Sequence, residues 1–146
     1  MSERKKVRLG RTGLMVTKTS FGALPIQRVS FDEAARLLRA AYEAGINFFD
    51  TANSYTDSEE KIGYALSDVR DKIIIATKSA YTTPGNADMV KRNLELSLRR
   101  MKTDYIDILQ FHNPSFCPDG DDPAYQYLVE MKRQGVVRHI GITNHR

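Results

Sequence analysis

Residues 45–63 read Gly45-Ile-Asn-Phe-Phe-Asp50-Thr-Ala-Asn-Ser-Tyr55-Thr-Asp-Ser-Glu-Glu-Lys-Ile-Gly63. The apolar run over 46–50 predicts a short buried strand that ends in a carboxylate. The acidic residues after Ser58 favour the positive end of a helix dipole, so a helix is predicted over 58–66. A charge at the end of a buried strand is costly unless it lies at an open rim. We therefore expect Asp50 and Tyr55 in an accessible connection between the strand and the helix.

The same alternation of strand and helix extends along the chain in both directions. Residues 6–18 are predicted to form a β-hairpin whose tight turn contains two glycines. Ser30, with Glu33 three residues later, has the spacing of a helix capping box. Successive strands start roughly 25 to 30 residues apart, which suits βαβ units. The predicted strands are 19–23, 46–50, 72–77, 105–109 and 136–142, and the predicted helices are 30–45, 58–66, 86–101 and 123–134.

Two architectures fit this order of elements: an open parallel sheet with helices on both faces, and part of a (β/α)8 barrel. An open nucleotide-binding sheet should show G-x-G-x-x-G after its first strand, whereas this chain has Phe-Gly22-Ala23-Leu-Pro. The barrel is therefore favoured. We predict an α/β fold that is a partial (β/α)8 TIM barrel, with an N-terminal β-hairpin and about four and a half β/α units. Residues 1–146 are expected to form a single domain.

The composition indicates the cellular compartment and argues against several classes of partner. The 146 residues include 22 Lys and Arg against 18 Asp and Glu, a net charge of +4 that is spread along the chain and predicts no nucleic-acid-binding face. The single cysteine, Cys117, excludes an internal disulfide or a Cys-rich metal site, and it fits a reducing compartment. Neither a signal-peptide pattern nor an apolar run of membrane-spanning length is visible. We expect a cytoplasmic protein with no metal, no membrane partner and no nucleic-acid partner.

Polar side chains follow three of the predicted strands. Asp50 and Tyr55 follow the first, Ile-Ile-Ile-Ala-Thr leads to Lys78, and Ile-Leu-Gln-Phe leads to His112. The carboxyl ends of parallel strands meet at one rim, where barrel enzymes place their chemistry. Each residue also has an ordinary interpretation: an Asx turn or helix cap for the aspartate, a surface tyrosine, a solvated rim lysine and a loop histidine. Only a shared site predicts all four residues together, and we call them the tetrad.

These motifs carry a resemblance to a known family. The stretch 45–63 resembles the first signature of the aldo-keto reductases, and the segments that end at Lys78 and His112 resemble that family's lysine and histidine strands. Gly-Ile-Thr143-Asn144 is similar to its cofactor motif, and the opening hairpin matches the one that closes the bottom of its barrel. The chain departs from the family at Thr56, where glycine is common, at Thr143, which replaces serine, and in length, because the second half is missing.

The resemblance implies an NADP(H)-dependent oxidoreductase that reduces aldehydes or ketones by hydride transfer, with a small carbonyl compound as substrate. A phenol has a pKa of about 10, and a nearby cation favours its ionised form. Tyr55 is therefore expected to be the general acid, with Lys78 as the cation, Asp50 holding the lysine, and His112 orienting the carbonyl oxygen. The residues implied to contact the cofactor are Gly22, Ala23, Asp50, Thr143 and Asn144.

A second hypothesis does not involve catalysis. A barrel that ends after its fifth strand has two unpaired sheet edges and an exposed apolar face. The chain would then be a catalytically inactive, truncated half-barrel that acts as an assembly module, or as a dimer that self-associates through the exposed half-barrel face. The sequence alone leaves both hypotheses open.

Overall fold

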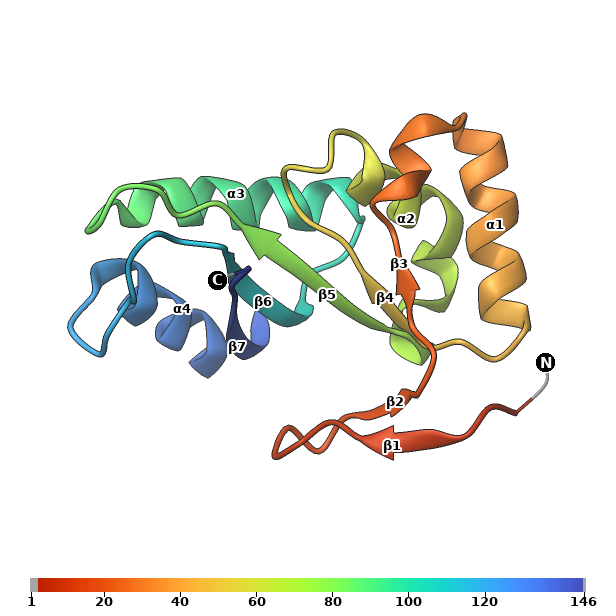
Figure 1. The fold of residues 1–146 in the computed structure, drawn as a ribbon, viewed down its shortest axis with the longest axis horizontal. Coiled ribbons are helices and arrows are strands. Elements are labelled where there is room, and N and C mark those ends of the chain that lie inside the picture. The colour runs from red at the N-terminus through yellow and green to blue at the C-terminus, as the bar shows by residue number, and fades with distance from the viewer. Residues whose placement is uncertain (1–2, 146) are drawn as a thin grey trace.

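A computed structural model describes residues 3–145 of the chain, and a five-stranded parallel sheet forms its centre. The strands lie in the order β3-β4-β5-β6-β7, so each strand pairs with its neighbour in sequence, as successive βαβ units require. The predicted alternation of parallel strands and helices is confirmed (Figure 1). The strands are β3 (Phe21–Gly22), β4 (Phe48–Asp50), β5 (Ile74–Ser79), β6 (Ile106–His112) and β7 (Val137–Thr143).

Four α-helices connect these strands, and each begins with a signal that the sequence contains. The Ser30 side chain accepts a hydrogen bond from the Glu33 backbone N–H at 3.1 Å, although the Glu33 carboxylate pairs with Arg36 rather than closing the capping box. Asp122 caps α4 in the same way. Two short 3₁₀ helices, which were not predicted, follow β3 and α2. The helices are α1 (Phe31–Glu43), α2 (Ser58–Leu66), α3 (Ala87–Arg100), α4 (Pro123–Arg133), η1 (Pro25–Arg28) and η2 (Ser67–Lys72).

Two strand boundaries differ from the prediction in a way that matters for the site. β5 and β6 extend further toward the rim than predicted, so Lys78 and His112 lie within strands rather than after them. Lys78 pairs in register with Gln110, and its carbonyl accepts a hydrogen bond from the Asn53 N–H at 3.0 Å. The strand therefore continues because its backbone groups find partners on both sides.

The predicted hairpin is present and closes the opposite end of the sheet. β1 (Lys6–Arg8) and β2 (Met15–Thr17) pair antiparallel, and they lie beneath the start of β4 and β5 (Figure 1). The side chain of Asn47, just before β4, joins the two units. It accepts a hydrogen bond from the Thr17 N–H at 2.8 Å and donates one to the Met15 carbonyl at 2.9 Å.

The apolar core lies between the sheet and the helices that cover its outer face. Each helix contributes side chains spaced three or four residues apart, as expected for an amphipathic helix on a sheet. Within residues 3–145, no helix is long and apolar enough to cross a membrane. The buried helix residues include Ala34, Leu38, Ile62, Leu66, Val90, Leu94, Ala124 and Leu128, and they pack on strand residues that include Phe49, Ile75, Ile106, Leu109 and Val137.

The close approach of α2 to the end of α3 requires a glycine. A Cβ at Gly63 would lie 2.8 Å from the Met101 Cα and even closer to the Arg100 carbonyl oxygen. Alanine is favoured in helices by about 1 kcal/mol, but a clash with backbone cannot be relieved by rotating a side chain. We expect Gly63→Ala to lower the free energy of unfolding by about 1–3 kcal/mol in urea denaturation. Gly120→Ala, whose Cβ would meet nothing within 4 Å, is the control and should leave the urea midpoint unchanged.

Candidate active site

The sheet register brings the tetrad together at the carboxyl ends of three adjacent strands. Asp50 ends β4, Lys78 is the penultimate residue of β5 and His112 ends β6. Tyr55 lies in the loop over 51–57, between β4 and α2. The strands are neighbours in the sheet, so the three strand-borne side chains emerge side by side, and the loop brings the tyrosine to them.

Lys78 is buried and its ammonium group is paired. The side chain donates a hydrogen bond to Asp50 Oδ2 at 2.9 Å and another to the Thr51 carbonyl at 2.6 Å. Only 7% of the residue is exposed, so the interpretation as a solvated rim lysine is wrong. A buried cation is tolerated when oxygen acceptors replace its water. Asp50 therefore serves as the counter-ion of a buried lysine.

Tyr55 lies against both the lysine and the histidine. Lys78 Nζ is 5.2 Å from the centroid of the Tyr55 ring, and the ring meets that of His112 edge to face at a centroid distance of 5.8 Å. Among residues 3–145 the Tyr55 hydroxyl forms no hydrogen bond. The tyrosine is half-buried, so this hydroxyl is available to a ligand at the rim.

His112 is kept neutral by its surroundings. Burial is the main cause that lowers its pKa below the ordinary value of 6.5, the positive charges of Lys78 and His145 lower it further, and Asp50 opposes them. The ring Nδ1 lies 3.3 Å from the hydroxyl of Ser54. The unfolded chain binds a proton at a pH where folded His112 does not, so this group lowers stability as the pH falls through 6.5 toward the folded pKa.

Apart from Asp50 on β4, the residues expected at the cofactor lie on or just after the two outer strands of the sheet. Thr143 ends β7 and pairs in register with His112. Its hydroxyl donates to the Phe111 carbonyl at 3.3 Å and accepts from the Asn113 N–H at 3.2 Å, which leaves one lone pair for a ligand. Asn144, the next residue, is exposed.

Gly22 and Ala23 differ in what they offer a ligand. Gly22 is exposed at the end of β3, and a Cβ there would meet nothing within 4 Å, so the space beside it is open. Ala23 is fully buried. Its N–H donates to the Asp50 carbonyl at 2.8 Å and its carbonyl accepts from the Ser58 hydroxyl at 2.9 Å. Ala23 therefore shapes the rim without offering a free hydrogen-bonding group.

The residue that follows Tyr55 has a strained backbone conformation. Thr56 has a backbone φ of +33°, in the region that favours glycine, at the position where the resemblance leads one to expect glycine. Its hydroxyl donates a hydrogen bond to Gln27 Oε1 at 3.0 Å. A β-branched residue in this conformation costs on the order of 1–3 kcal/mol, so surrounding contacts must hold the loop in place.

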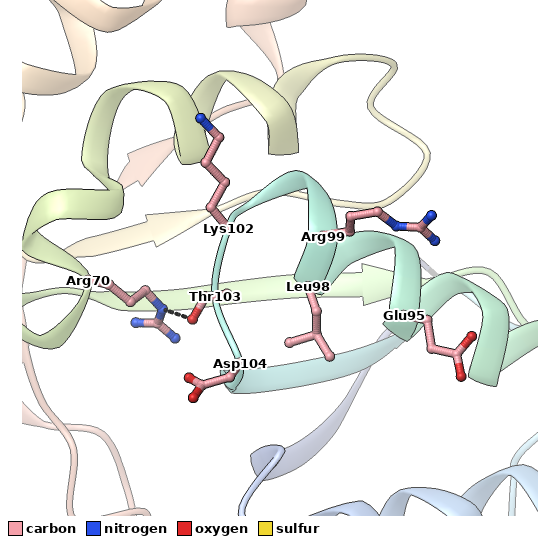
Figure 2. Close-up of a pocket in the computed structure, with 7 residues that line it drawn as sticks. All are labelled: Arg70, Glu95, Leu98, Arg99, Lys102, Thr103 and Asp104. Atoms are coloured by element: carbon pink, nitrogen blue, oxygen red, sulfur yellow. Dashed lines mark hydrogen bonds between the residues drawn. The ribbon is translucent and has the colours of Figure 1, made fainter.

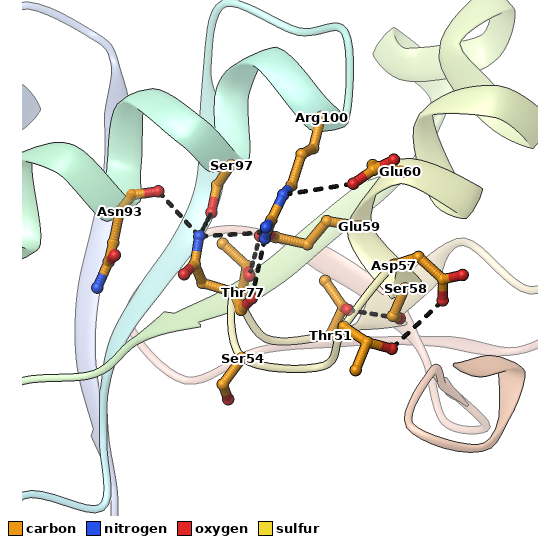
Figure 3. A network of polar contacts seen from close by, with 12 residues as sticks. Thr51, Ser54, Asp57, Ser58, Glu59, Glu60, Thr77, Asn93, Ser97 and Arg100 are labelled. Atoms are coloured by element: carbon orange, nitrogen blue, oxygen red, sulfur yellow. Dashed lines mark hydrogen bonds and ion pairs between the residues drawn. The ribbon is translucent and has the colours of Figure 1, made fainter. Parts of the chain in front are cut away.

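Sequence reasoning missed the polar network beneath the tetrad. Glu59 and Glu60 are the acidic residues that favour the helix start after Ser58, and both lie in the first turn of α2. The structure separates them, because Glu59 is fully buried while the Glu60 side chain is 49% exposed. Figure 3 shows Glu59 between Thr77 and Arg100, on the side of β5 that faces the helices. Its partners come from distant parts of the chain, so no local pattern could have identified it.

A hollow of about 710 Å³ lies at the other end of the strands (Figure 2). It is open to solvent, and its buried member, Arg70, already pairs with Asp107 at 2.8 Å and donates to Thr103. It contains no tetrad residue, so we do not assign the chemistry to it. The described part of the chain also contains no cluster of three His, Cys, Asp or Glu residues able to hold a metal ion. The residues that line the hollow are Arg70, Glu95, Leu98, Arg99, Lys102, Thr103 and Asp104.

The charge balance around His112 can be tested directly. Lys78→Met removes a cation and frees the Asp50 carboxylate, and both changes favour the protonated ring. We expect the pKa of His112 to rise, as measured by an NMR titration of its ring protons. Lys91→Met, an exposed change on α3, is the control and should leave the titration unaltered. An unchanged pKa in Lys78→Met would show that the lysine does not act on this ring.

Comparison with known proteins agrees with the fold and with the motifs. A model of the aldo/keto reductase family matches residues 13–146. L-galactose dehydrogenase of Arabidopsis thaliana is 37% identical over 149 residues, which cover 92% of this chain and 47% of that protein. The 6-dehydroglucose reductase of Novosphingobium aromaticivorans is 32% identical over 154 residues, which cover 93% of this chain and 50% of that protein.

Solved structures give the same result. The aldo-keto reductase of Bacillus halodurans, in its holo form, superposes with a TM-score of 0.87 and 32% identity over 99% of this chain and 51% of its own. That of Klebsiella pneumoniae, in complex with NADPH, gives a TM-score of 0.83 and 27% identity over 99% and 50%. The chain spans about half the length of the curated relatives it matches. It therefore belongs to the aldo/keto reductase family, and it represents the N-terminal half of that family's (β/α)8 barrel.

Proposed function

We propose that this chain supplies the proton-transfer site of an NADP(H)-dependent reduction of aldehydes or ketones. The observation that carries the proposal is the Tyr55 hydroxyl, which has no partner among residues 3–145 and belongs to a ring that lies against a buried ammonium and a neutral imidazole. A phenol, a cation and a hydrogen-bond donor at one open rim suit the protonation of a carbonyl oxygen.

Tyr55 would donate the proton. The phenolate that remains after the transfer is stabilised by the positive charge of Lys78, whose Nζ lies 5.2 Å from the ring centroid. Asp50 keeps this lysine charged and in place through the 2.9 Å ion pair. The burial of Lys78 strengthens the effect, because a charge acts more strongly where water is excluded.

His112 would orient the carbonyl group. Its lowered pKa keeps the ring neutral near pH 7, so one nitrogen carries a proton and the other accepts. When the Ser54 hydroxyl donates to Nδ1, the proton is on Nε2, which can then donate a hydrogen bond to the substrate oxygen. A neutral donor holds the oxygen without competing with Tyr55 as an acid.

NADP(H), when bound, supplies the hydride. The polar groups at the rim fit its nicotinamide end: Thr143 retains one acceptor lone pair, and Asn144, an exposed residue, has a side-chain amide whose donors and acceptor match a carboxamide. Asp50 uses Oδ2 for Lys78, so Oδ1 can accept a ribose hydroxyl. The open space beside Gly22 leaves room for the ligand. The NADPH complex of the Klebsiella pneumoniae relative supports this assignment.

A chimeric barrel tests the proposed acid. Residues 1–146 would replace the matching half of the Bacillus halodurans reductase, which covers 99% of this chain at a TM-score of 0.87. In NADPH-dependent aldehyde reduction, Tyr55→Phe should lower kcat by about 10²–10⁴-fold, because it removes the proton donor but keeps the ring. NADPH affinity should change little.

The control is Tyr42→Phe on α1, where the ring packs against Arg39 far from the rim. This variant should keep the kcat of the unmodified chimera. Equal rates for Tyr55→Phe and Tyr42→Phe would rule out Tyr55 as the general acid.

The 146-residue chain alone is expected to bind NADPH weakly or not at all. The residues that we propose to contact the cofactor, Gly22, Asp50, Thr143 and Asn144, would all meet its nicotinamide end. Few contacts give little binding energy to offset the entropy lost on association. A fluorescence titration with NADPH measures this. Saturation at low micromolar concentration, together with carbonyl turnover, would contradict the expectation.

A further inference from the structure

The carboxylate of Glu59 is fully buried and joins three elements. It accepts hydrogen bonds from Thr77 Oγ1 on β5 at 2.7 Å, from Asn53 Nδ2 in the loop at 3.4 Å and from Arg100 on α3 at 3.2 Å (Figure 3). A charge with no solvent exposure is strongly unfavourable unless partners replace the lost water. Here every partner is supplied by the chain itself.

These partners fix the loop that carries Tyr55. Asn53 lies two residues before the tyrosine, and its N–H donates to the Lys78 carbonyl at 3.0 Å. Its own carbonyl accepts from Arg100 at 2.9 Å, and its side chain also donates to Ser97 Oγ at 3.1 Å. The middle of the loop is therefore held by hydrogen bonds to β5 and α3.

The hydrogen bonds of Glu59 lie on the face of β5 opposite the tetrad. Side chains of consecutive strand residues point to opposite faces, so Thr77 points toward the helices and Glu59, while Lys78 points toward Asp50. Glu59 therefore contacts neighbours of Tyr55 and Lys78 without reaching the rim where a substrate would bind. Its influence on chemistry must pass through the position of those two residues.

A second buried carboxylate provides the comparison. Asp107 is 3% exposed, pairs with Arg70 at 2.8 Å and accepts from the Ile75 N–H at 2.9 Å. It lies near the start of β6, away from the rim. The two ion pairs are alike in burial and chemistry, but only that of Glu59 has partners within two residues of the tetrad.

We propose that Glu59 is a positioning residue: with Asn53 and Arg100, it holds the loop over 51–57 so that the Tyr55 hydroxyl stays beside Lys78 and His112. The significance of this position rests on the proposed function. Whether Glu59 holds Tyr55 in place can be tested independently of that function.

NMR of the chain tests the position without cofactor or substrate. In Glu59→Ala, the nuclear Overhauser contact between the ring protons of Tyr55 and His112, whose centroids are 5.8 Å apart, should be lost. Exchange of the Asn53 amide with solvent should become at least about tenfold faster, because its loop opens locally. Asp107→Ala is the matched control, because it removes a similarly buried and paired carboxylate, and it should leave both signals unchanged even where it lowers global stability.

Two conservative variants separate shape from charge. Glu59→Gln retains the length: its amide oxygen can still accept from Asn53 and Arg100, and its amide nitrogen can donate to the Thr77 hydroxyl, so the ring contact should be preserved. Glu59→Asp retains the charge but is one methylene too short and should lose the contact. Should Glu59→Ala fail to fold, Thr77→Val removes one donor at constant shape, and faster Asn53 exchange is expected there too. The inference is overturned if ring contact and amide exchange in Glu59→Ala, or amide exchange in Thr77→Val, match those of Asp107→Ala. A chimera that lacks activity while these signals are intact would instead count against the proposed function.

Discussion

The burial of the Lys78 ammonium is the constraint on which this rim depends. At 7% exposure the cation needs oxygen acceptors in place of water, and it finds two: Asp50 Oδ2 and the Thr51 carbonyl. Both acceptors belong to the turn that leaves β4, so satisfying the lysine also fixes the end of one strand against its neighbour. The loop that follows can then place Tyr55 over the lysine. Removing the Asp50 carboxylate would leave the buried ammonium without its counter-ion, a cost of about 3–5 kcal/mol.

In this half-barrel the proposed proton-transfer residues and most of the proposed cofactor contacts lie on different strands. Three tetrad residues lie on β4, β5 and β6, which are paired on both sides, and the fourth lies in a loop bound to β5. All four residues of the proposed proton-transfer site therefore lie within the described part of this chain. Apart from Asp50, the proposed cofactor contacts instead lie on or just after β3 and β7, the outer strands, each of which pairs on one side only among the described residues. The β/α units that the relatives have beyond the matched half would therefore matter more for cofactor binding than for the geometry of the proposed acid.

Periodicity and motif order were sufficient to predict the parallel strands, the helices and the clustering of the tetrad, because these depend on local patterns and on the rule that parallel strand ends share a rim. Two kinds of feature needed the structure. The ends of β5 and β6 depend on pairing with residues such as Asn53, which are distant in sequence. The burial of Glu59 depends on Arg100, 41 positions away, and nothing local distinguishes it from Glu60. Likewise, the lowered pKa of His112 follows from burial that no motif encodes.

The position of Tyr55 outside any strand explains why so many contacts converge on its loop. A strand residue is oriented by its ladder, but a loop residue must be oriented by side chains, and this loop also contains the strained φ of Thr56. The Thr56 hydroxyl is bound to Gln27 on one side, and Asn53 is bound to β5 and α3 on the other. With Glu59 buried beneath, the loop is held at both ends against a strain of about 1–3 kcal/mol. A tyrosine held in this way keeps its hydroxyl at the rim before any ligand arrives, so less ordering entropy is lost when a carbonyl compound binds.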